Sequence, residues 1–225
     1  MNNELKIVPS ILSADFANLG RDIAAIENDC EALHIDIMDG HYVPNLSMGV
    51  PVVKSIRKVS KLTFDTHLMI TNPEDFIKPF AEAGSDMITF HIECTKDAEA
   101  LIADIRKLGV KAGVAIHPDT PIEVLAPFCK KGACDLILIM CVNPGFGEQS
   151  FMESAYDRIR AVRKMLDDDS SEALLAIDGG IRPSNIASAA EAGARHIVAG
   201  SAVFKSEDPG ATVRELTKLG NDSIR

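Results

Sequence analysis

Residues 32–69 read ALHIDIMDGHYVPNLSMGVPVVKSIRKVSKLTFDTHLM, and this stretch decides the fold. It begins and ends with apolar, β-branched runs, Ala32–Met38 and Thr63–Met69, and an amphipathic segment, Val50–Val59, lies between them. A strand–helix–strand order of this kind is typical of two parallel strands joined by a right-handed crossover. The stretch therefore predicts one unit of an α/β fold with a parallel sheet.

The same unit recurs along the rest of the chain. The predicted strands are Lys6–Leu12, Ala32–Met38, Thr63–Met69, Met87–His91, Lys111–Ile116, Leu136–Cys141, Leu174–Ile177 and His196–Ala199. The predicted helices are Leu19–Glu27, Val50–Val59, Pro73–Ala83, Ala98–Leu108, Pro121–Lys130, Phe151–Leu166, Pro183–Ala192 and Ala211–Leu219. Eight such units, without a linker or a shift in composition, favour a closed (β/α)8 TIM barrel over an open doubly wound sheet. We predict one domain that spans residues 1–225.

The composition excludes several classes of protein. The 225 residues carry a net charge of −10 without a sustained basic patch, so a nucleic-acid partner is not expected. No apolar run approaches the roughly 20 residues needed to cross a bilayer, and the polar N-terminus does not resemble a signal peptide. The five cysteines form no CxxC pair and indicate reduced thiols in a cytoplasmic protein. Among them Cys141 lies near the candidate site, where a spectator thiol is favoured over a nucleophile.

Polar residues gather at the C-terminal ends of the predicted strands, where barrels of this class carry their functional groups. Successive side chains alternate between the faces of a strand, so His34 and Asp36 share a face of the second strand, and His67 is expected at comparable depth on the third. Imidazole and carboxylate groups in this arrangement suit a divalent transition metal. The alternative is that each histidine is a hydrogen-bonded core residue. A metal is favoured because three ionisable groups directed into an apolar barrel are costly without a counter-ion.

Asp178 directly follows the seventh predicted strand. It would lie across a barrel from the second strand and complete a set of two histidines and two aspartates. Inversion at a carbon atom requires that a proton leave one face and another return to the opposite face. Two opposed carboxylates, Asp36 and Asp178, are the arrangement that an epimerase needs. The alternative is that Asp178 only caps the tight turn at Gly179 and Gly180.

Glycine-rich loops follow the sixth, seventh and eighth strands, and they are typical of a phosphate site built from backbone N–H groups. Their candidate phosphate-binding residues are Gly145, Phe146, Gly147, Gly179, Gly180, Gly200 and Ser201. Three methionines end strands at the same level and are expected to surround the metal centre: Met38, Met69 and Met140.

Together these residues resemble the ribulose-phosphate 3-epimerase family. The matching stretches follow one another along nearly the whole chain: Pro9–Asp15, His34–Asn45, His67–Met69, Val142–Gly147, Asp178–Ile181 and Gly200–Phe204. The resemblance implies a (β/α)8 barrel and a divalent metal held by His34, Asp36, His67 and Asp178, with Asp36 and Asp178 as the acid/base pair. It also implies that Ser10 contacts the substrate and that the glycine loops and Ser201 hold its phosphate. We further expect His67 and the three methionines to contact the substrate.

The implied activity is the interconversion of D-ribulose 5-phosphate and D-xylulose 5-phosphate in the pentose phosphate pathway. We expect one divalent ion per subunit, with Zn²⁺ favoured over Fe²⁺, Mn²⁺ and Co²⁺, and a homo-oligomer, because the family forms dimers or hexamers. The alternatives are a 3-epimerase of a six-carbon ketose phosphate such as allulose 6-phosphate, a metal-dependent aldolase or hydrolase, and a non-catalytic phosphosugar-binding barrel. One departure from the family is Glu148, where a second glycine is more usual. A carboxylate near a phosphate is unfavourable unless it points away, so this residue bears on substrate affinity.

Overall fold

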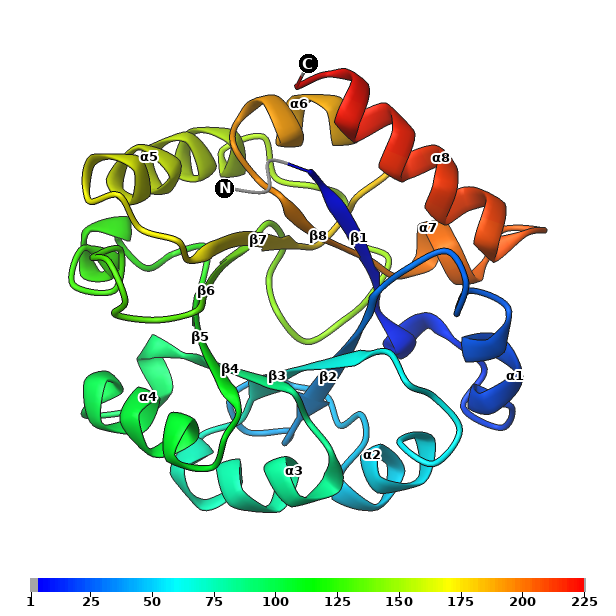
Figure 1. Cartoon of the computed structure of the whole chain (residues 1–225), viewed down its shortest axis with the longest axis horizontal. Helices are drawn as coiled ribbons and strands as arrows, with labels where there is room; N and C mark the ends of the chain where they lie inside the picture. Colours follow the sequence, from blue (N-terminus) through cyan, green and yellow to red (C-terminus); the bar gives the residue numbers. More distant parts are fainter. Residues whose placement is uncertain (1–3, 225) are drawn as a thin grey trace.

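The structure is a computed structural model that describes residues 4–224. Its strands are β1 (Lys6–Pro9), β2 (Ala32–Met38), β3 (Thr63–Met69), β4 (Met87–His91), β5 (Lys111–Ile116), β6 (Leu136–Met140), β7 (Leu174–Asp178) and β8 (His196–Ala199). They are parallel and pair in the order β1-β8-β7-β6-β5-β4-β3-β2, and an isolated bridge between Ser10 and His34 joins β1 to β2. Figure 1 shows the strands as a ring with the helices around its outside. The predicted (β/α)8 barrel is confirmed.

The helices are α1 (Leu19–Ala24), α2 (Val50–Ile56), α3 (Ile77–Ala83), α4 (Ala98–Lys107), α5 (Ala155–Asp168), α6 (Ile186–Glu191), α7 (Ser201–Phe204) and α8 (Pro209–Asp222). All but α7 fall within or overlap a predicted helix. The short α7 lies between β8 and α8, directly after the predicted phosphate loop at Gly200.

Two predicted helices differ from the structure, and internal prolines explain both. The predicted helix Pro73–Ala83 is a 3₁₀ turn at Pro73–Asp75 followed by α3, and the predicted helix Pro121–Lys130 shortens to the 3₁₀ segment Ile122–Leu125. Pro79 and Pro127 lie inside these segments. A proline has no N–H to donate to the carbonyl four residues before it, and its ring clashes with that carbonyl. The α-helical ladder therefore cannot extend from α3 back across Pro79, which lies in the first turn of that helix, nor from Ile122–Leu125 forward across Pro127.

The first predicted strand is also shorter than expected. It ends at Pro9, and Ser10 caps a 3₁₀ turn by accepting a hydrogen bond from the N–H of Leu12 at 3.3 Å. The chain thus leaves the sheet with the Ser10 side chain at the end of β1.

The barrel interior is divided into an apolar and a polar part. The main apolar core lies outside the ring of strands, where outward-facing strand residues such as Ile35 and Ile37 pack with buried residues of the surrounding helices. The apolar part is a separate cluster formed by residues of β4 to β7 together with Val142, which follows β6: Met87, Ala115, Leu136, Leu138, Met140, Val142 and Ala176. The polar part is built mainly by β2, β3 and β4, whose buried polar residues include His34, Asp36, Asp65, His67 and His91. Buried groups of this kind are costly unless they bond to one another, so their contacts define the site.

Candidate active site

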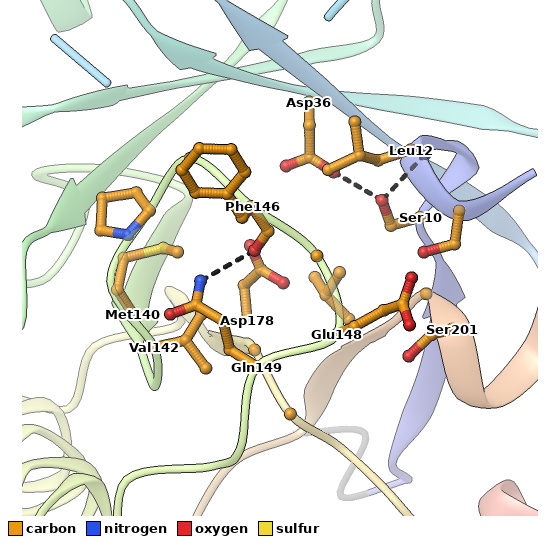
Figure 2. Close-up of a pocket in the computed structure, with 18 of the residues that line it drawn as sticks. Ser10, Leu12, Asp36, Met140, Val142, Phe146, Glu148, Gln149, Asp178 and Ser201 are labelled. Carbon is orange, nitrogen blue, oxygen red and sulfur yellow. Dashed lines mark hydrogen bonds between the residues drawn. The ribbon is translucent and has the colours of Figure 1, made fainter. Parts of the chain in front are cut away.

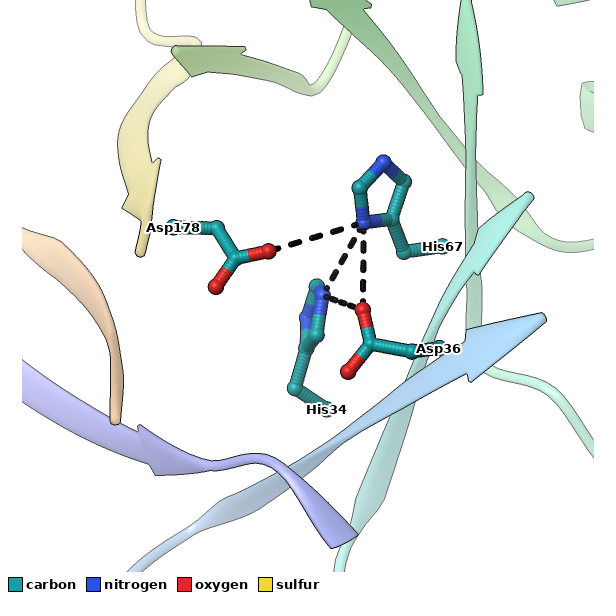
Figure 3. A group of neighbouring side chains, drawn as sticks. All are labelled: His34, Asp36, His67 and Asp178. Atoms are coloured by element: carbon teal, nitrogen blue, oxygen red, sulfur yellow. Dashed lines mark hydrogen bonds and ion pairs between the residues drawn. The ribbon is translucent and has the colours of Figure 1, made fainter. Parts of the chain in front are cut away.

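Four ionisable side chains meet at the C-terminal end of the barrel: His34 and Asp36 from β2, His67 from β3 and Asp178 from β7. One potential metal-ligand atom from each residue lies within 4.8 Å of the others. The Oδ1 atom of Asp36 is 3.3 Å from His34 Nε2 and 3.4 Å from His67 Nδ1, and that same Nδ1 is 3.9 Å from Asp178 Oδ2. Figure 3 shows Asp36 and Asp178 approaching the group from opposite sides. The structure thus brings together the four residues that the sequence predicted as one set.

Strand register accounts for this convergence. Asp36 lies beside His67 in the β2–β3 pairing, and His34 lies beside Asp65 two residues earlier. On the other side of the ring, Asp178 lies beside Met140 in the β6–β7 pairing. Because side chains alternate along each strand, one register places all of these groups on the inner face.

The donor set fits a divalent metal ion. Imidazole nitrogen and carboxylate oxygen atoms are common ligands of such ions, and four protein ligands are enough for a tetrahedral site. Both histidine side chains are fully buried, and the side chains of Asp36 and Asp178 are 4% and 17% exposed. Two buried carboxylates this close together need positive charge to balance them. The cluster could therefore bind a metal ion.

The surroundings push the pKa values of the two carboxyl groups in opposite directions. Burial alone would raise the pKa of Asp36, but the neighbouring His34 and His67 outweigh it and hold that pKa well below its usual range. Burial and the negative charge of Asp36 raise the pKa of Asp178 to about 6. For His34, burial acts to lower the pKa, whereas Asp36 and Asp65 raise it well above its usual value. In the metal-free protein Asp36 therefore stays ionised, and Asp178 is the carboxyl group of the pair that takes up a proton as the pH falls toward 6.

A cavity opens above the cluster, and Figure 2 shows part of its lining. The cavity brings together all but one of the residues predicted to bind substrate, which are Ser10, Met38, Met69, Met140, Gly145, Phe146, Gly147, Gly179, Gly180, Gly200 and Ser201. The exception is His67, which is fully buried and does not line the cavity. Asp36 and Asp178 also line it. Both carboxylates can therefore reach a molecule bound there.

Ser10 is held against the cluster from β1. Its hydroxyl donates a hydrogen bond to Asp36 Oδ2 at 2.5 Å, and its Oγ also accepts the bond from Leu12 that ends the strand (Figure 2). The carboxylate of Asp36 thus contacts Ser10 on one side and the two histidines on the other. These contacts fix its orientation.

The glycines after β7 adopt conformations that other residues rarely reach. Gly179 has φ +117° and Gly180 has φ +69°, and a Cβ atom at Gly180 would lie 2.4 Å from the backbone nitrogen of Phe151. The loop after β7 therefore packs directly against the segment that leads into α5, and glycine is required for this close approach.

The loop after β6 contains the residue that departs from the family pattern. Glu148 lines the cavity with φ +65°, an unusual backbone conformation for a residue other than glycine. Its carboxylate forms an ion pair with Lys205, at the end of α7. The pair balances the charge that the sequence suggested would repel a phosphate, although both side chains are more than half exposed.

The sequence did not predict the residues that contact the second ring nitrogens of His34 and His67, those not directed at Asp36. His34 Nδ1 is 3.0 Å from Asp65 Oδ2, which is also 3.0 Å from His196 Nε2. His67 Nε2 is 2.9 Å from His91 Nε2. The alternation of side chains along β3 places Asp65 on the same face as His67, but no sequence signal connects His91 or His196 to the cluster.

Two other residues have local roles. Cys141 is fully buried, and burial raises the pKa of its thiol, so the spectator interpretation fits better than a nucleophile. His117, which follows β5, accepts a hydrogen bond from the N–H of Asp119 at 3.2 Å and so helps to form the turn after the strand.

Across residues 4–224, no helix is both long and apolar enough to span a membrane.

The fold and the site define a class, the (β/α)8 barrels that combine a buried metal-type cluster with a glycine-lined cavity at the C-terminal mouth. One solved structure with this fold is orotidine 5'-phosphate decarboxylase from Pyrococcus horikoshii, which aligns with a TM-score of 0.69 at 13% identity over 96% of this chain and 99% of that chain. At this identity the likeness concerns the fold alone.

Sequence comparison identifies the family. The model of the ribulose-phosphate 3 epimerase family matches residues 6–204. A ribulose-phosphate 3-epimerase of Mycobacterium bovis is 46% identical over 94% of this chain and 91% of its own length. The cytoplasmic isoform from Oryza sativa subsp. japonica is 44% identical over 95% of this chain and 93% of its own length. The chain belongs to the ribulose-phosphate 3-epimerase family, which confirms the predicted family and the predicted enzyme class, an epimerase.

Proposed function

We propose that the protein is a metal-dependent 3-epimerase that interconverts D-ribulose 5-phosphate and D-xylulose 5-phosphate. The observation that carries this proposal is the placement of Asp36 and Asp178, which reach one cavity from opposite sides of the same cluster (Figure 3). A barrel that only binds a phosphosugar has no need of two opposed carboxylates. An aldolase or hydrolase would cleave a bond rather than invert a centre.

A divalent metal held by His34, Asp36, His67 and Asp178 would supply Lewis acid stabilisation of the negative charge that develops when the C3 proton leaves. One carboxylate removes that proton from its face of the substrate and leaves a planar cis-enediolate. The other carboxyl group returns a proton to the opposite face. The opposite pKa shifts of the metal-free protein, downward for Asp36 and upward for Asp178, mark Asp178 as the carboxyl group of the pair that holds a proton more readily. The roles reverse for the other epimer.

The glycine loops and Ser201 would bind the phosphate. Backbone N–H groups can hold a dianion without a basic surface, which agrees with the acidic composition of the chain. Met38, Met69 and Met140 would form an apolar wall beside the reacting carbon, since all three line the cavity and are at least 95% buried. Ser10 would contact both the substrate and Asp36.

The remaining expectations belong to the same proposal. The metal is one ion per subunit, with Zn²⁺ favoured, because two imidazoles and two carboxylates are suitable ligands for it. The chain forms a single domain and assembles as a dimer or hexamer. The cytoplasm is the proposed location, supported by the description of the rice relative as a cytoplasmic isoform.

The test is NMR of the purified protein with D-ribulose 5-phosphate in D₂O. We expect deuterium at C3 together with D-xylulose 5-phosphate, and the loss of both after treatment with a chelator. Restoring Zn²⁺ should recover both signals.

Other outcomes would contradict specific parts of the proposal. Deuterium exchange without the new epimer would mean that protons leave and return on only one face of the substrate, so the role proposed for Asp178 would be wrong. Neither signal in the metal-loaded protein would exclude the pentose substrate, and allulose 6-phosphate would then be the substrate to test.

A further inference from the structure

A line of hydrogen-bonded side chains leads from the four-residue cluster, through β4, to the edge of the barrel. His67 Nε2 lies 2.9 Å from His91 Nε2. The other ring nitrogen of His91, Nδ1, lies 2.8 Å from the Tyr42 hydroxyl and 3.3 Å from Glu93 Oε2. The side chains of His67 and His91 are fully buried, whereas that of Glu93 is 23% exposed. The line therefore begins at the cluster and ends at a carboxylate that water can reach.

When His67 binds a cation, the hydrogen atoms on the ring nitrogens along this line can be placed in only one way. The Nδ1 atom of His67 faces Asp36 and Asp178, so this nitrogen must hold the free lone pair, and Nε2 must carry the hydrogen. That hydrogen can then be donated to Nε2 of His91 only if this nitrogen is unprotonated. His91 must accordingly carry its own hydrogen on Nδ1.

The outer end of the line accepts that second hydrogen. His91 Nδ1–H can donate to the Tyr42 hydroxyl or directly to the carboxylate of Glu93, and the Tyr42 hydroxyl donates to the same carboxylate at 3.4 Å. An ionised carboxylate can only accept hydrogen bonds. Glu93 therefore selects the tautomer of His91, and His91 in turn selects the tautomer of His67.

His34, the other histidine of the cluster, contacts a carboxylate directly, without a second histidine between them. His34 Nδ1 meets the carboxylate of Asp65 directly, and this contact lies wholly inside the barrel. Histidines that bind metals usually donate their second N–H to a carboxylate, a carbonyl or water, and this partner fixes the ring and its tautomer. His34 reaches a carboxylate in one step, whereas His67 reaches one through a second histidine.

We propose that His91 is a positioning residue for His67 and that Glu93 completes its action. His91 holds the tautomer of His67 whose Nδ1 lone pair faces the cluster, and it thereby raises the affinity of the cluster for a divalent cation. His91 does not line the cavity, so it acts through His67 and not on the substrate. The inference rests on the proposed function in one respect, that the cluster is a metal site.

The test is the affinity of the metal-free protein for Co²⁺, followed by the visible absorption of the bound ion. We expect the His91→Phe variant, which has no acceptor for the His67 N–H, to bind Co²⁺ about 10- to 100-fold more weakly than the wild type. The His91→Gln variant should recover much of the affinity, because its side-chain carbonyl can accept that N–H. The Glu93→Gln variant should weaken binding by a smaller factor, because an amide can also donate and no longer selects one tautomer of His91.

A matched control is His117→Phe, which makes the same change at a histidine directly after β5 and keeps the backbone N–H that residue 117 donates to Glu93 Oε1 at 2.9 Å. It should leave the affinity for Co²⁺ unchanged. Thermal unfolding of each metal-free variant separates a structural effect from positioning, because a merely structural role would lower the melting temperature without changing the affinity of the folded protein.

The outcomes distinguish this inference from the proposed function. Wild-type affinity in folded His91→Phe would overturn the inference and leave the metal site in place. If His91→Phe does not fold, Glu93→Gln decides, since its residue is partly exposed, and unchanged affinity in that variant would also overturn the inference. Failure of the wild type to bind Co²⁺ would overturn the metal site and the inference together.

Discussion

The cluster of His34, Asp36, His67 and Asp178 differs from the glycine-lined mouth above it in how its geometry is held. The cluster consists of side chains that are fully or largely buried, and three of them, His34, Asp36 and His67, are held by hydrogen bonds to other buried groups. The mouth consists largely of backbone, and it includes side chains that are open to solvent, such as Phe146, which is 55% exposed. Buried side chains that are held in place suit bond-making chemistry, whereas exposed N–H groups suit binding of a charged group. We therefore expect changes in the cluster to lower kcat and changes in the mouth to raise KM.

The largest expected effect is the loss of either carboxylate. Asp36→Asn and Asp178→Asn should each lower kcat by about 1,000-fold or more, since an amide cannot exchange the proton. Steady-state kinetics in both directions measures this. Asp157→Asn on α5, whose side chain is 89% exposed, is the matched control and should keep full activity. Near-normal turnover in either cluster variant would be incompatible with the two-carboxylate mechanism.

The second effect tests the mouth. In Gly180→Ala, the new Cβ would lie 2.4 Å from the Phe151 nitrogen, so the loop must move, and we expect KM to rise by roughly tenfold or more. Gly109→Ala is a control with a similar φ of +78° and no atom within 4 Å of the new Cβ. It should lower stability without changing KM. Equal KM values for the two variants would mean that the mouth has no special role in substrate binding.

The third effect concerns stability and pH in the metal-free protein. Burial and the charge of Asp36 raise the pKa of Asp178 to about 6, above the value of about 3.9 for an unfolded aspartate. The folded state therefore binds this proton more tightly, and stability falls as pH rises from about 4 to 6, with the full cost present above that range. Asp178→Asn should raise the free energy of unfolding at pH 8 by on the order of 1 kcal/mol, and by less at pH 5.

Urea unfolding at the two pH values measures this difference, with Asp157→Asn again as the control. A gain of equal size at pH 5 and pH 8 would show that the effect does not come from the Asp178 charge. The expected result combines higher stability with lost turnover in one variant, as occurs when a functional group is held at a cost to the fold.

The smallest effect is at the ion pair between Glu148 and Lys205. Lys205→Met leaves the loop carboxylate unbalanced near the phosphate loops and should raise KM by up to about fivefold, the range that an exposed pair can supply. The increase should disappear in the double variant Glu148→Gly/Lys205→Met and should shrink at high salt. An equal increase of KM in the single and double variants would mean that Lys205 acts independently of Glu148.

The sequence predicted the cluster because the alternation of side chains is a local property. On β2 and β3 it places His34, Asp36 and His67 on one face, and Asp178 follows from the end of another strand. The partners of the histidines could not be predicted in this way. The contact of His67 with His91 depends on the β3–β4 register, and the bond between Asp65 and His196 crosses the barrel interior.

The helices show the same division between local and non-local information. Their positions followed from apolar periodicity, but the effect of Pro79 and Pro127 on their lengths was not anticipated, although it is also local. The ion pair of Glu148 with Lys205 depends on where two loops meet, which no local pattern contains.

The isolated bridge between Ser10 and His34 has a consequence for how activity depends on the integrity of the ring. Every other neighbouring pair of strands shares a continuous ladder, so the junction of β1 and β2 is the seam of the barrel. The contact between Ser10 and Asp36 crosses that seam. A barrel that opened there would keep its ladders and its helices, and its circular dichroism would change little, yet Asp36 would lose its partner from β1. A measurement of turnover would therefore detect whether the ring is closed, which a measurement of secondary structure would not detect.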